Sequence, residues 1–486
     1  MTTVTPARSS EAPLQLDAFI DGRAARSGKT FSVINPATGD VYAEVADCTA
    51  EIAAEAVDAA VAAFASWKKT TAPQRSQLLK AWHAEIICNQ ESLARALSSE
   101  MGKPYTEALG EIAYAAAYVE LYAEEATRIY GETFPSQHAH KRLFANRQPV
   151  GPVYAVTPWN FPAAMVTRKI APALAAGCTA IVKPAEQSPV TALLLAGLWQ
   201  KVGGPAGTLQ VLTASDPAAV SQVMFDSAKI RKLTFTGSTD VGRMLYEQSA
   251  RTIKRVSLEL GGHAPFIVFA DADIEKAVNE VMLCKFRNAG QTCVCTNRIY
   301  VQRPILEAFN AALSKRVQAL RMGDPADPDT QIGPLVDADA LAKVKRHVAD
   351  AVAKGAKVLV GGDSPQGLYF SPTVLADVAP GMEILTEETF GPVAPVLAFD
   401  DEDEVIRLAN DTPYGLAAYV YTRDLSRAFR VSESLEYGIV GVNDGAPSTA
   451  QAPFGGTKDS GIGREGGKWG LEEYLEVRYV SIALDQ

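Results

Sequence analysis

The apolar residues of the first quarter of the chain recur at helical spacing. In residues 51–67, EIAAEAVDAAVAAFASW, they stand three or four positions apart, and residues 73–103 continue in the same style. Side chains at that spacing share one face of a helix, which can pack against a core. We therefore predict that the first 130 residues are largely helical.

The pattern changes at Val150, where buried strands begin to alternate with helices. The strand patterns are VGPVYAV, CTAIVKPA, TLQVLT, KLTFTGS and RVSLELG, with helical stretches between them. Such alternation predicts a parallel, doubly wound sheet that binds its ligand at the carboxyl ends of the strands. After Gly262 a second alternation starts with APFIVFA and runs to about Val442. The chain is therefore expected to hold two α/β domains.

Two further fragments alternate like strands outside both predicted sheets. They read HAHKRLFANRQPV and LEEYLEVRYVSIAL. Exposed strand edges are normally covered, so these fragments are expected to pair with each other or with another subunit. We expect a homodimer or homotetramer.

Composition and charge narrow the possible partners. The 486 residues carry a formal charge of −10, which repels polyanions, so we expect no nucleic acid and no anionic membrane as partner. No apolar run of about 18 residues suggests a transmembrane helix. The start, MTTVTPARSSEAPLQ, does not resemble a secretory signal, and the six cysteines show no disulfide framework. These features favour the cytoplasm.

Two motifs follow predicted strands at the edge where a nucleotide would bind. In FTGSTDVGR the chain turns at Gly237 and Ser238 into a helix, where backbone N–H groups could meet a phosphate or the turn could stay empty. In IVKPAEQSP, Lys183 and Glu186 end a strand. A glutamate there can accept hydrogen bonds from ribose hydroxyls, whereas a plain surface ion pair is the alternative.

Two other motifs offer a candidate general base and a candidate oxyanion donor. Glu259 of VSLELGG ends a strand before two glycines, where a buried carboxylate could act as a general base or pair with a structural lysine. Asn160 of TPWNFP stands between two prolines, which stiffen the loop. A rigid amide could stabilise an oxyanion, and an Asx-turn is the alternative.

The stretch FRNAGQTCVCTNR holds two cysteines, Cys293 and Cys295, one residue apart. They lack the C-x-x-C spacing of zinc and redox motifs, and the chain has only five histidines, so we expect no metal. A resting disulfide across one residue would be strained. Buried thiols and a nucleophile remain open.

Taken in order, the motifs TPWNFP, KPAE, FTGSTDVG, LELGG, FRNAGQTC, EETFGP and PFGGTKDSGIGRE resemble the NAD(P)-dependent aldehyde dehydrogenase superfamily, from about Leu14 to Leu484. The resemblance implies an α/β fold with three parts. These are a Rossmann-type parallel-sheet cofactor domain (residues 14–130 and 149–261), an α/β catalytic domain (262–450) and a small β element for oligomerisation (131–148 and 470–486).

The resemblance also implies roles for individual residues. Cys293 would be the nucleophile, Glu259 the base that activates the hydrolytic water, and Asn160 the oxyanion donor. The cofactor is expected to be NAD, with NADP weaker, because the Glu186 carboxylate would repel a 2′-phosphate. The residues implied to bind the cofactor are Pro158, Trp159, Lys183, Glu186, Gly237, Ser238, Leu260, Glu388 and Phe390.

Within the superfamily, TPWNFPAAMVTRK and FRNAGQTCVCTNR are most similar to the succinate-semialdehyde dehydrogenases. That resemblance assigns Arg168, Arg287 and Ser448 to the distal carboxylate of the substrate, although either arginine could instead serve a structural ion pair. The loop NDGAPSTAQA is less apolar than expected, so glutarate semialdehyde, 2-oxoglutarate semialdehyde and broad aliphatic aldehydes remain alternatives. Selection on one methylene is worth only about 1 to 3 kcal/mol.

Three further hypotheses concern the cysteines and the activity as a whole. Cys295 could form a reversible bond with Cys293 under peroxide, or be a packed spectator thiol. A cysteine hydrolase would need a histidine partner, for which His263 is the nearest candidate. A non-catalytic scaffold would be free to lose its nucleophile and base, and both are present.

Overall fold

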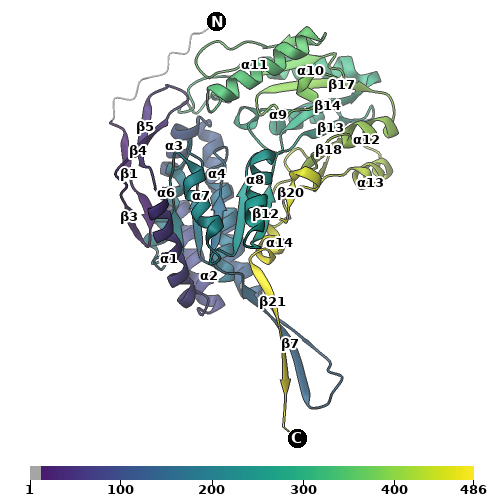
Figure 1. The fold of residues 1–486 in the computed structure, drawn as a ribbon. Helices are drawn as coiled ribbons and strands as arrows, with labels where there is room; N and C mark the ends of the chain where they lie inside the picture. The colour runs from purple at the N-terminus through teal and green to yellow at the C-terminus, as the bar shows by residue number, and fades with distance from the viewer. Residues whose placement is uncertain (1–11, 486) are drawn as a thin grey trace.

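The structure, a computed structural model, describes residues 12–485 and contains four β-sheets (Figure 1). Two large sheets form the bodies of two α/β layers, and two three-stranded sheets lie beside them. Residues 1–11, on which part of the signal-peptide prediction rests, lie outside the described residues. No helix among residues 12–485 is long and apolar enough to cross a bilayer.

The first large sheet contains the five strands predicted between Val150 and Gly262, and all five pair in parallel. Short strands join it antiparallel at both edges. In order across the sheet the strands are β20 (Gly461–Ile462), β12 (Arg255–Glu259), β11 (Lys232–Thr236), β8 (Val153–Val156), β9 (Ala180–Lys183), β10 (Leu209–Val211), β2 (Ala18–Ile20) and β3 (Arg23–Ala25). The predicted parallel, doubly wound sheet is confirmed.

Helices surround this sheet, and α5 is its most enclosed element. All residues of α5 are buried, since it packs against α4 and the sheet on opposite sides. The helices are α1 (Ala50–Trp67), α2 (Ala72–Cys88), α3 (Gln90–Met101), α4 (Tyr105–Glu125), η1 (Ala126–Arg128), α5 (Ala164–Ala176), α6 (Val190–Lys201), α7 (Pro217–Asp226) and α8 (Thr239–Ala250).

The prediction of a largely helical start is wrong for the residues before Ala50. There the chain forms β1 (Leu14–Leu16), β2, β3, β4 (Thr30–Ile34) and β5 (Val41–Ala46). Strands of three to six residues are too short to show a period in the sequence. Pairing decides their conformation: β5 pairs with β1 and β4, β3 pairs with β2, and β2 also pairs with β10 far along the chain.

The second large sheet begins at β13, as the pattern after Gly262 predicts. Its strands are parallel except for β15, which pairs antiparallel with β16. In order they are β15 (Lys357–Val360), β16 (Thr373–Ala376), β17 (Val393–Phe399), β14 (Thr296–Gln302), β13 (Ala264–Val268), β18 (Ala417–Tyr421) and β19 (Ile439–Val442). The helices that follow β13 in the chain are α9 (Ile274–Phe286), η2 (Arg287–Gly290), η3 (Arg303–Ile305), α10 (Leu306–Gln318), α11 (Ala338–Ala353), η4 (Glu383–Leu385), α12 (Glu402–Asn410), α13 (Leu425–Ser434), η5 (Lys458–Ser460) and α14 (Gly467–Glu472). Of these, α14 packs against α4 and α5 beside the first sheet.

Side-chain caps fix where the helices nearest the site begin. Ser238, Asp273 and Asp337 precede α8, α9 and α11, and each accepts a hydrogen bond from a backbone N–H three residues on. These N–H groups have no partner within the helix, so a capping oxygen stabilises the start by about 1 kcal/mol.

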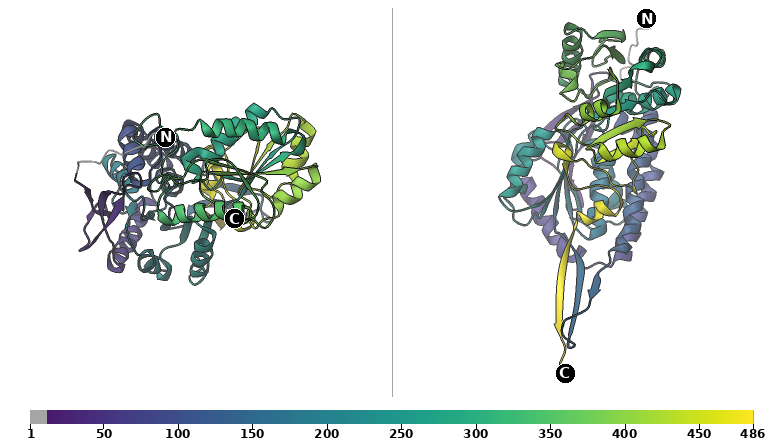
Figure 2. Two further views of the ribbon diagram at one scale, coloured as in Figure 1. Left: turned by 90° about the horizontal axis from the view of Figure 1, so that it is seen from above. Right: turned by 90° about the vertical axis from the view of Figure 1, so that its right-hand side faces the viewer.

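The two outlying strand fragments pair with each other. Strand β21 (Leu475–Ala483) runs antiparallel to β7 (Lys141–Pro149), and β6 (Glu132–Phe134) completes a three-stranded sheet. The β7 and β21 strands extend away from the body of the molecule (Figures 1 and 2). This pairing leaves the outer edge of β21 open.

Candidate active site

A left-handed turn presents Cys293. After α9, Asn288 and Ala289 have φ angles of 51° and 52°, which costs of order 1 to 3 kcal/mol for each residue. The turn is held in place from outside: the Asn288 backbone N–H donates to Glu107 Oε2 at 2.7 Å, and Asn288 Nδ2 donates to the Asn160 carbonyl at 3.2 Å. The residues of the FRNAGQTC motif therefore form a strained turn, which α4 and the Asn160 loop stabilise.

Two cavities meet at Cys293. The first, of about 340 Å³, lies at the carboxyl ends of β8, β11 and β12. The second, of about 310 Å³, lies between α4, α5 and the Cys293 loop. Cys293 and Met165 line both. A reactive thiol placed there can meet a ligand from each side.

The first cavity brings together most of the residues predicted to bind the cofactor. Trp159 and Phe390 approach edge to face with ring centroids 5.5 Å apart, which provides an apolar wall. Lys183 and Glu186 form an ion pair with each other at the end of β9 and are not among the lining residues. The predicted residues that line the cavity are Pro158, Trp159, Gly237, Ser238, Leu260, Glu388 and Phe390.

These features fit a dinucleotide. The Gly237–Ser238 turn leads into the N-terminus of α8 at the end of a parallel strand, and Glu388 presents a carboxylate to the same space. Asp337, Asp339 and Lys343 of α11 also line this cavity, and no motif in the sequence pointed to them. Helix α11 belongs to the second domain, so only the folded chain shows that it closes the cavity.

Glu388 is held at the point where the LELGG motif passes the Cys293 loop. Its Oε1 accepts a hydrogen bond from the Gly262 N–H at 3.2 Å. Burial raises the pKa of Glu388 to about 7. A Cβ on Gly262 would lie 2.4 Å from the Cys293 carbonyl oxygen, so this position requires glycine. Gly262, the second glycine of the LELGG motif, thus contacts both the Glu388 carboxylate and the Cys293 backbone.

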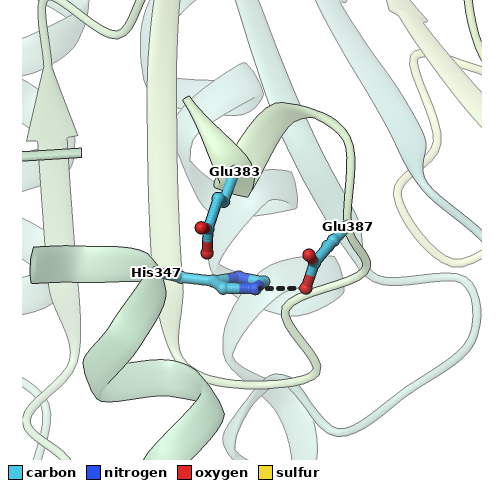
Figure 3. A group of neighbouring side chains, drawn as sticks. All are labelled: His347, Glu383 and Glu387. Carbon is cyan, nitrogen blue, oxygen red and sulfur yellow. Dashed lines mark hydrogen bonds and ion pairs between the residues drawn. The ribbon is translucent and has the colours of Figure 1, made fainter. Parts of the chain in front are cut away.

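His347 of α11 contacts both chain neighbours of Glu388, which are Glu387 and Thr389. Figure 3 shows the contact with Glu387. Its Nε2 lies 3.1 Å from Glu387 Oε2, and its Nδ1 lies 3.2 Å from Thr389 Oγ1. His347 is fully buried, and burial lowers its pKa, so the neutral ring is favoured. The imidazole therefore holds the loop that carries Glu388 against α11.

His347, Glu383 and Glu387 also stand close enough to suggest a metal site, with one ligand atom from each within 4.8 Å of the others (Figure 3). Arg346 pairs with both carboxylates, at 3.2 Å from Glu383 and 2.6 Å from Glu387. A guanidinium already neutralises these oxygens, so the cluster serves as an ion-paired clamp.

Asn160 is fixed through its backbone as well as its side chain. Its carbonyl accepts a hydrogen bond from Lys103 Nζ at 2.8 Å, and its Nδ2 donates to the Gln291 carbonyl at 3.1 Å. One amide hydrogen is thereby used, and Asn160 lines the first cavity together with Cys293. Lys103 is fully buried and pairs with Glu111, which in turn accepts a hydrogen bond from the Ala163 N–H at 2.9 Å.

Glu259 ends β12 with both carboxylate oxygens buried and without a hydrogen-bond partner in the described residues. Burial raises its pKa, and the nearby Glu465 carboxylate adds to the shift. Burial likewise raises the pKa of Cys293, and Glu259 contributes. Glu259 lines neither of these two cavities.

The second cavity is lined by all three residues predicted to bind the distal carboxylate, Arg168, Arg287 and Ser448. Arg168 is already paired: its Nε lies 2.6 Å from Glu465 Oε2, and its guanidinium lies 4.0 Å from the Phe454 ring centroid. Of the two roles considered for Arg168, substrate binding and a structural ion pair, the structure therefore shows the ion pair.

Arg287 differs from Arg168 in its ion pairing. The Nε of each arginine is buried without a hydrogen-bond partner, and the Arg287 guanidinium lies 5.4 Å from the Phe161 ring centroid. Within residues 12–485 it takes part in no ion pair. Arg287 therefore offers an unpaired guanidinium to the second cavity.

Cys295 points away from both cavities. It is fully buried, and its Sγ lies 3.3 Å from Lys285 Nζ. All six cysteines are free thiols. His263 is also fully buried, and neither cavity has a histidine among the described residues that line it. The hydrolase alternative thus has no histidine beside Cys293.

Comparison with known proteins identifies the family. A sequence profile described as the aldehyde dehydrogenase family matches residues 23–480. The chain belongs to the aldehyde dehydrogenase family. The resemblance seen in the motifs is confirmed. The prediction that the chain is an NAD(P)-dependent oxidoreductase is confirmed with it.

Named relatives and a solved structure of this family match nearly the whole chain. The glutarate-semialdehyde dehydrogenase of Pseudomonas putida is 52% identical over 469 residues, covering 96% of this chain and 98% of the relative. The NADP(+) succinate-semialdehyde dehydrogenase GabD of Escherichia coli is 52% identical over 462 residues, covering 95% and 96%. A crystal structure of an aldehyde dehydrogenase from Brucella melitensis biovar abortus has a TM-score of 0.96 at 51% identity, covering 97% and 98%. The predicted aldehyde dehydrogenase fold is confirmed.

Proposed function

We propose that the enzyme oxidises an aldehyde whose far end carries an acid group, with succinate semialdehyde as first candidate, to the dicarboxylic acid. The observation that carries this proposal is the unpaired Arg287 guanidinium in the cavity that opens on Cys293. A guanidinium pairs bidentately with a carboxylate and stays charged. The names of the two semialdehyde dehydrogenase relatives point to the same class of substrate.

The residues around Cys293 support a thioester route. Cys293 reacts as the thiolate, after its proton has passed to solvent. Its Sγ bonds to the aldehyde carbon, and the oxyanion that forms accepts a hydrogen bond from Asn160 Nδ2. When bound, NAD or NADP supplies the acceptor for the hydride that leaves this carbon. Glu259 then takes a proton from the water that attacks the thioester, which releases the acid and restores the thiol. Ser448 and Arg287 hold the distal carboxylate throughout.

We infer that NAD is preferred over NADP. Glu186 stands near the end of β9, where an acidic side chain favours ribose hydroxyls and repels a 2′-phosphate. Its ion pair with Lys183 offsets part of that repulsion, so weaker NADP activity is expected. The Escherichia coli relative is named for NADP(+), which is consistent with some NADP activity here.

We also infer a homodimer or homotetramer built on the β7–β21 sheet. Val477 and Tyr479 of β21 are 60% and 59% exposed, and burial of such residues favours association. Size-exclusion chromatography with light scattering tests this, and a monomer would contradict it.

A cytoplasmic location stays a prediction, which the six free thiols support.

The experiment that tests the proposed function follows the formation of NADH and NADPH with four aldehydes. These are succinate semialdehyde, glutarate semialdehyde, 2-oxoglutarate semialdehyde and an uncharged aliphatic aldehyde of similar length. We expect the highest kcat/KM with an acidic aldehyde and NAD. A higher kcat/KM for the uncharged aldehyde would refute the role of Arg287 and leave only the family activity.

A further inference from the structure

Gly110 stands inside helix α4 without a local reason to be glycine. Helix α4 runs for 21 residues, and an interior glycine makes a helix less stable than alanine does. Gly110 is absent from the positive-φ glycines, so its backbone conformation suits any residue. A Cβ at this position would meet no heavy atom within 4 Å. Neither backbone geometry nor packing requires the glycine.

The position of Gly110 supplies another reason. It lines the second cavity together with Glu107, Glu111 and Tyr114, which lie on the same face of α4 at helical spacing. Gly110 is exposed, whereas Glu111 is buried, so Gly110 lies towards the open side of the cavity. Cys293 lies at the wall shared with the first cavity, where the aldehyde reacts.

The side chains on either side of Gly110 are already engaged and cannot withdraw easily. Glu107 accepts a hydrogen bond from the Asn288 N–H at 2.7 Å, and Glu111 is bound to Lys103 and the Ala163 N–H. The width of the cavity along α4 therefore depends on the residue at position 110.

We propose that Gly110 determines the length of substrate the enzyme accepts, by leaving room for the carbon chain of acidic semialdehydes longer than succinate semialdehyde. This inference rests on the proposed function, because it assumes a substrate held between Cys293 and Arg287. A methyl group at position 110 would meet no protein atom within 4 Å, so it would occupy free space beside a wall of the second cavity. Glycine is kept at a cost in helix stability because the cavity needs the space.

The test is the pair of variants Gly110→Ala and Gly110→Leu, assayed with succinate semialdehyde and glutarate semialdehyde. In Gly110→Ala we expect kcat/KM for the five-carbon substrate to fall by about tenfold or more, the effect of one methylene in a fitted pocket. The four-carbon substrate should lose less than about threefold on the same scale. Gly110→Leu should enlarge the difference between the two substrates.

The matched control is Gly197→Ala in α6. Gly197 is also an interior helix glycine whose Cβ would meet nothing within 4 Å, but it is exposed and lines neither cavity. Both alanine variants should raise Tm, because alanine is the better helix former. Only Gly110→Ala should change the ratio of the two kcat/KM values.

Equal losses on both substrates, or no loss on either, would overturn the proposal. A lowered Tm in Gly110→Ala would overturn it as well, because the glycine would then be structural. If the wild type oxidises only uncharged aldehydes, the proposed function fails separately. The role of Gly110 is then tested with uncharged aldehydes of four and five carbons. Gly110→Ala should again lower kcat/KM more for the five-carbon aldehyde than for the four-carbon aldehyde.

Discussion

Replacing Arg287 with glutamine tests the assignment on which the proposed function depends. The guanidinium forms no ion pair within residues 12–485. Burial raises the pKa of the nearby Glu107 carboxylate, and Lys103 still opposes that shift when Arg287 is replaced. A hydrogen bond to a charged group contributes about 1.5 to 3 kcal/mol. Because Arg287 is only half-buried, the lower part of that range applies, which corresponds to a change of about 10- to 30-fold.

The loss should fall on KM, because the distal carboxylate is bound equally in the ground state and the transition state. We expect Arg287→Gln to raise KM for succinate semialdehyde by that factor while kcat stays close to the wild-type value. KM for butanal, which has no carboxylate, should not change. Arg303→Gln is the matched control, since Arg303 is 60% exposed and pairs with Asp400 far from both cavities. Equal increases in KM for both aldehydes would refute the carboxylate role of Arg287.

Four further predictions test other parts of the site. Glu186→Ser should narrow the NAD over NADP ratio of kcat/KM by about tenfold, and an unchanged ratio would contradict the assignment of Glu186. Glu259→Gln should lower kcat at least about 100-fold. Because burial raises the pKa of Glu259, wild-type kcat should increase as pH rises through neutrality and the carboxylate ionises. A flat pH profile would argue against Glu259 as the base. If Cys295 forms a reversible bond with Cys293, Cys295→Ala should fail to regain activity with dithiothreitol after peroxide, and recovery equal to that of the wild type would end that hypothesis. His347→Phe removes both contacts that hold the Glu388 loop, so KM for NAD should rise about tenfold with KM for the aldehyde unchanged, whereas parallel changes would indicate a general loss of structure.

The sequence pattern predicted the parallel sheets because their strands are buried on both faces and alternate with helices in regular order. It failed at β1 to β5, where the strands have only three to six residues, too few to show a period, and form through pairing with one another and, for β2, with the distant β10. It also could not distinguish the two arginines. Arg168 and Glu465 are far apart in the chain, and only the fold shows that they are paired while Arg287 is not.

The sequence by itself determined which chemical groups are present and that the TPWNFP, KPAE and FTGSTDVG motifs stand at strand ends, since strand patterns and turn residues are local properties. This was sufficient to indicate Cys293 as a candidate nucleophile and to recognise the family. The tertiary structure alone decided how these groups are supported: α4 holds the Cys293 turn through Glu107, α11 holds the Glu388 loop through His347, and Gly110 widens the second cavity. These contacts join segments from different parts of the chain, and no local pattern records which distant segments will meet.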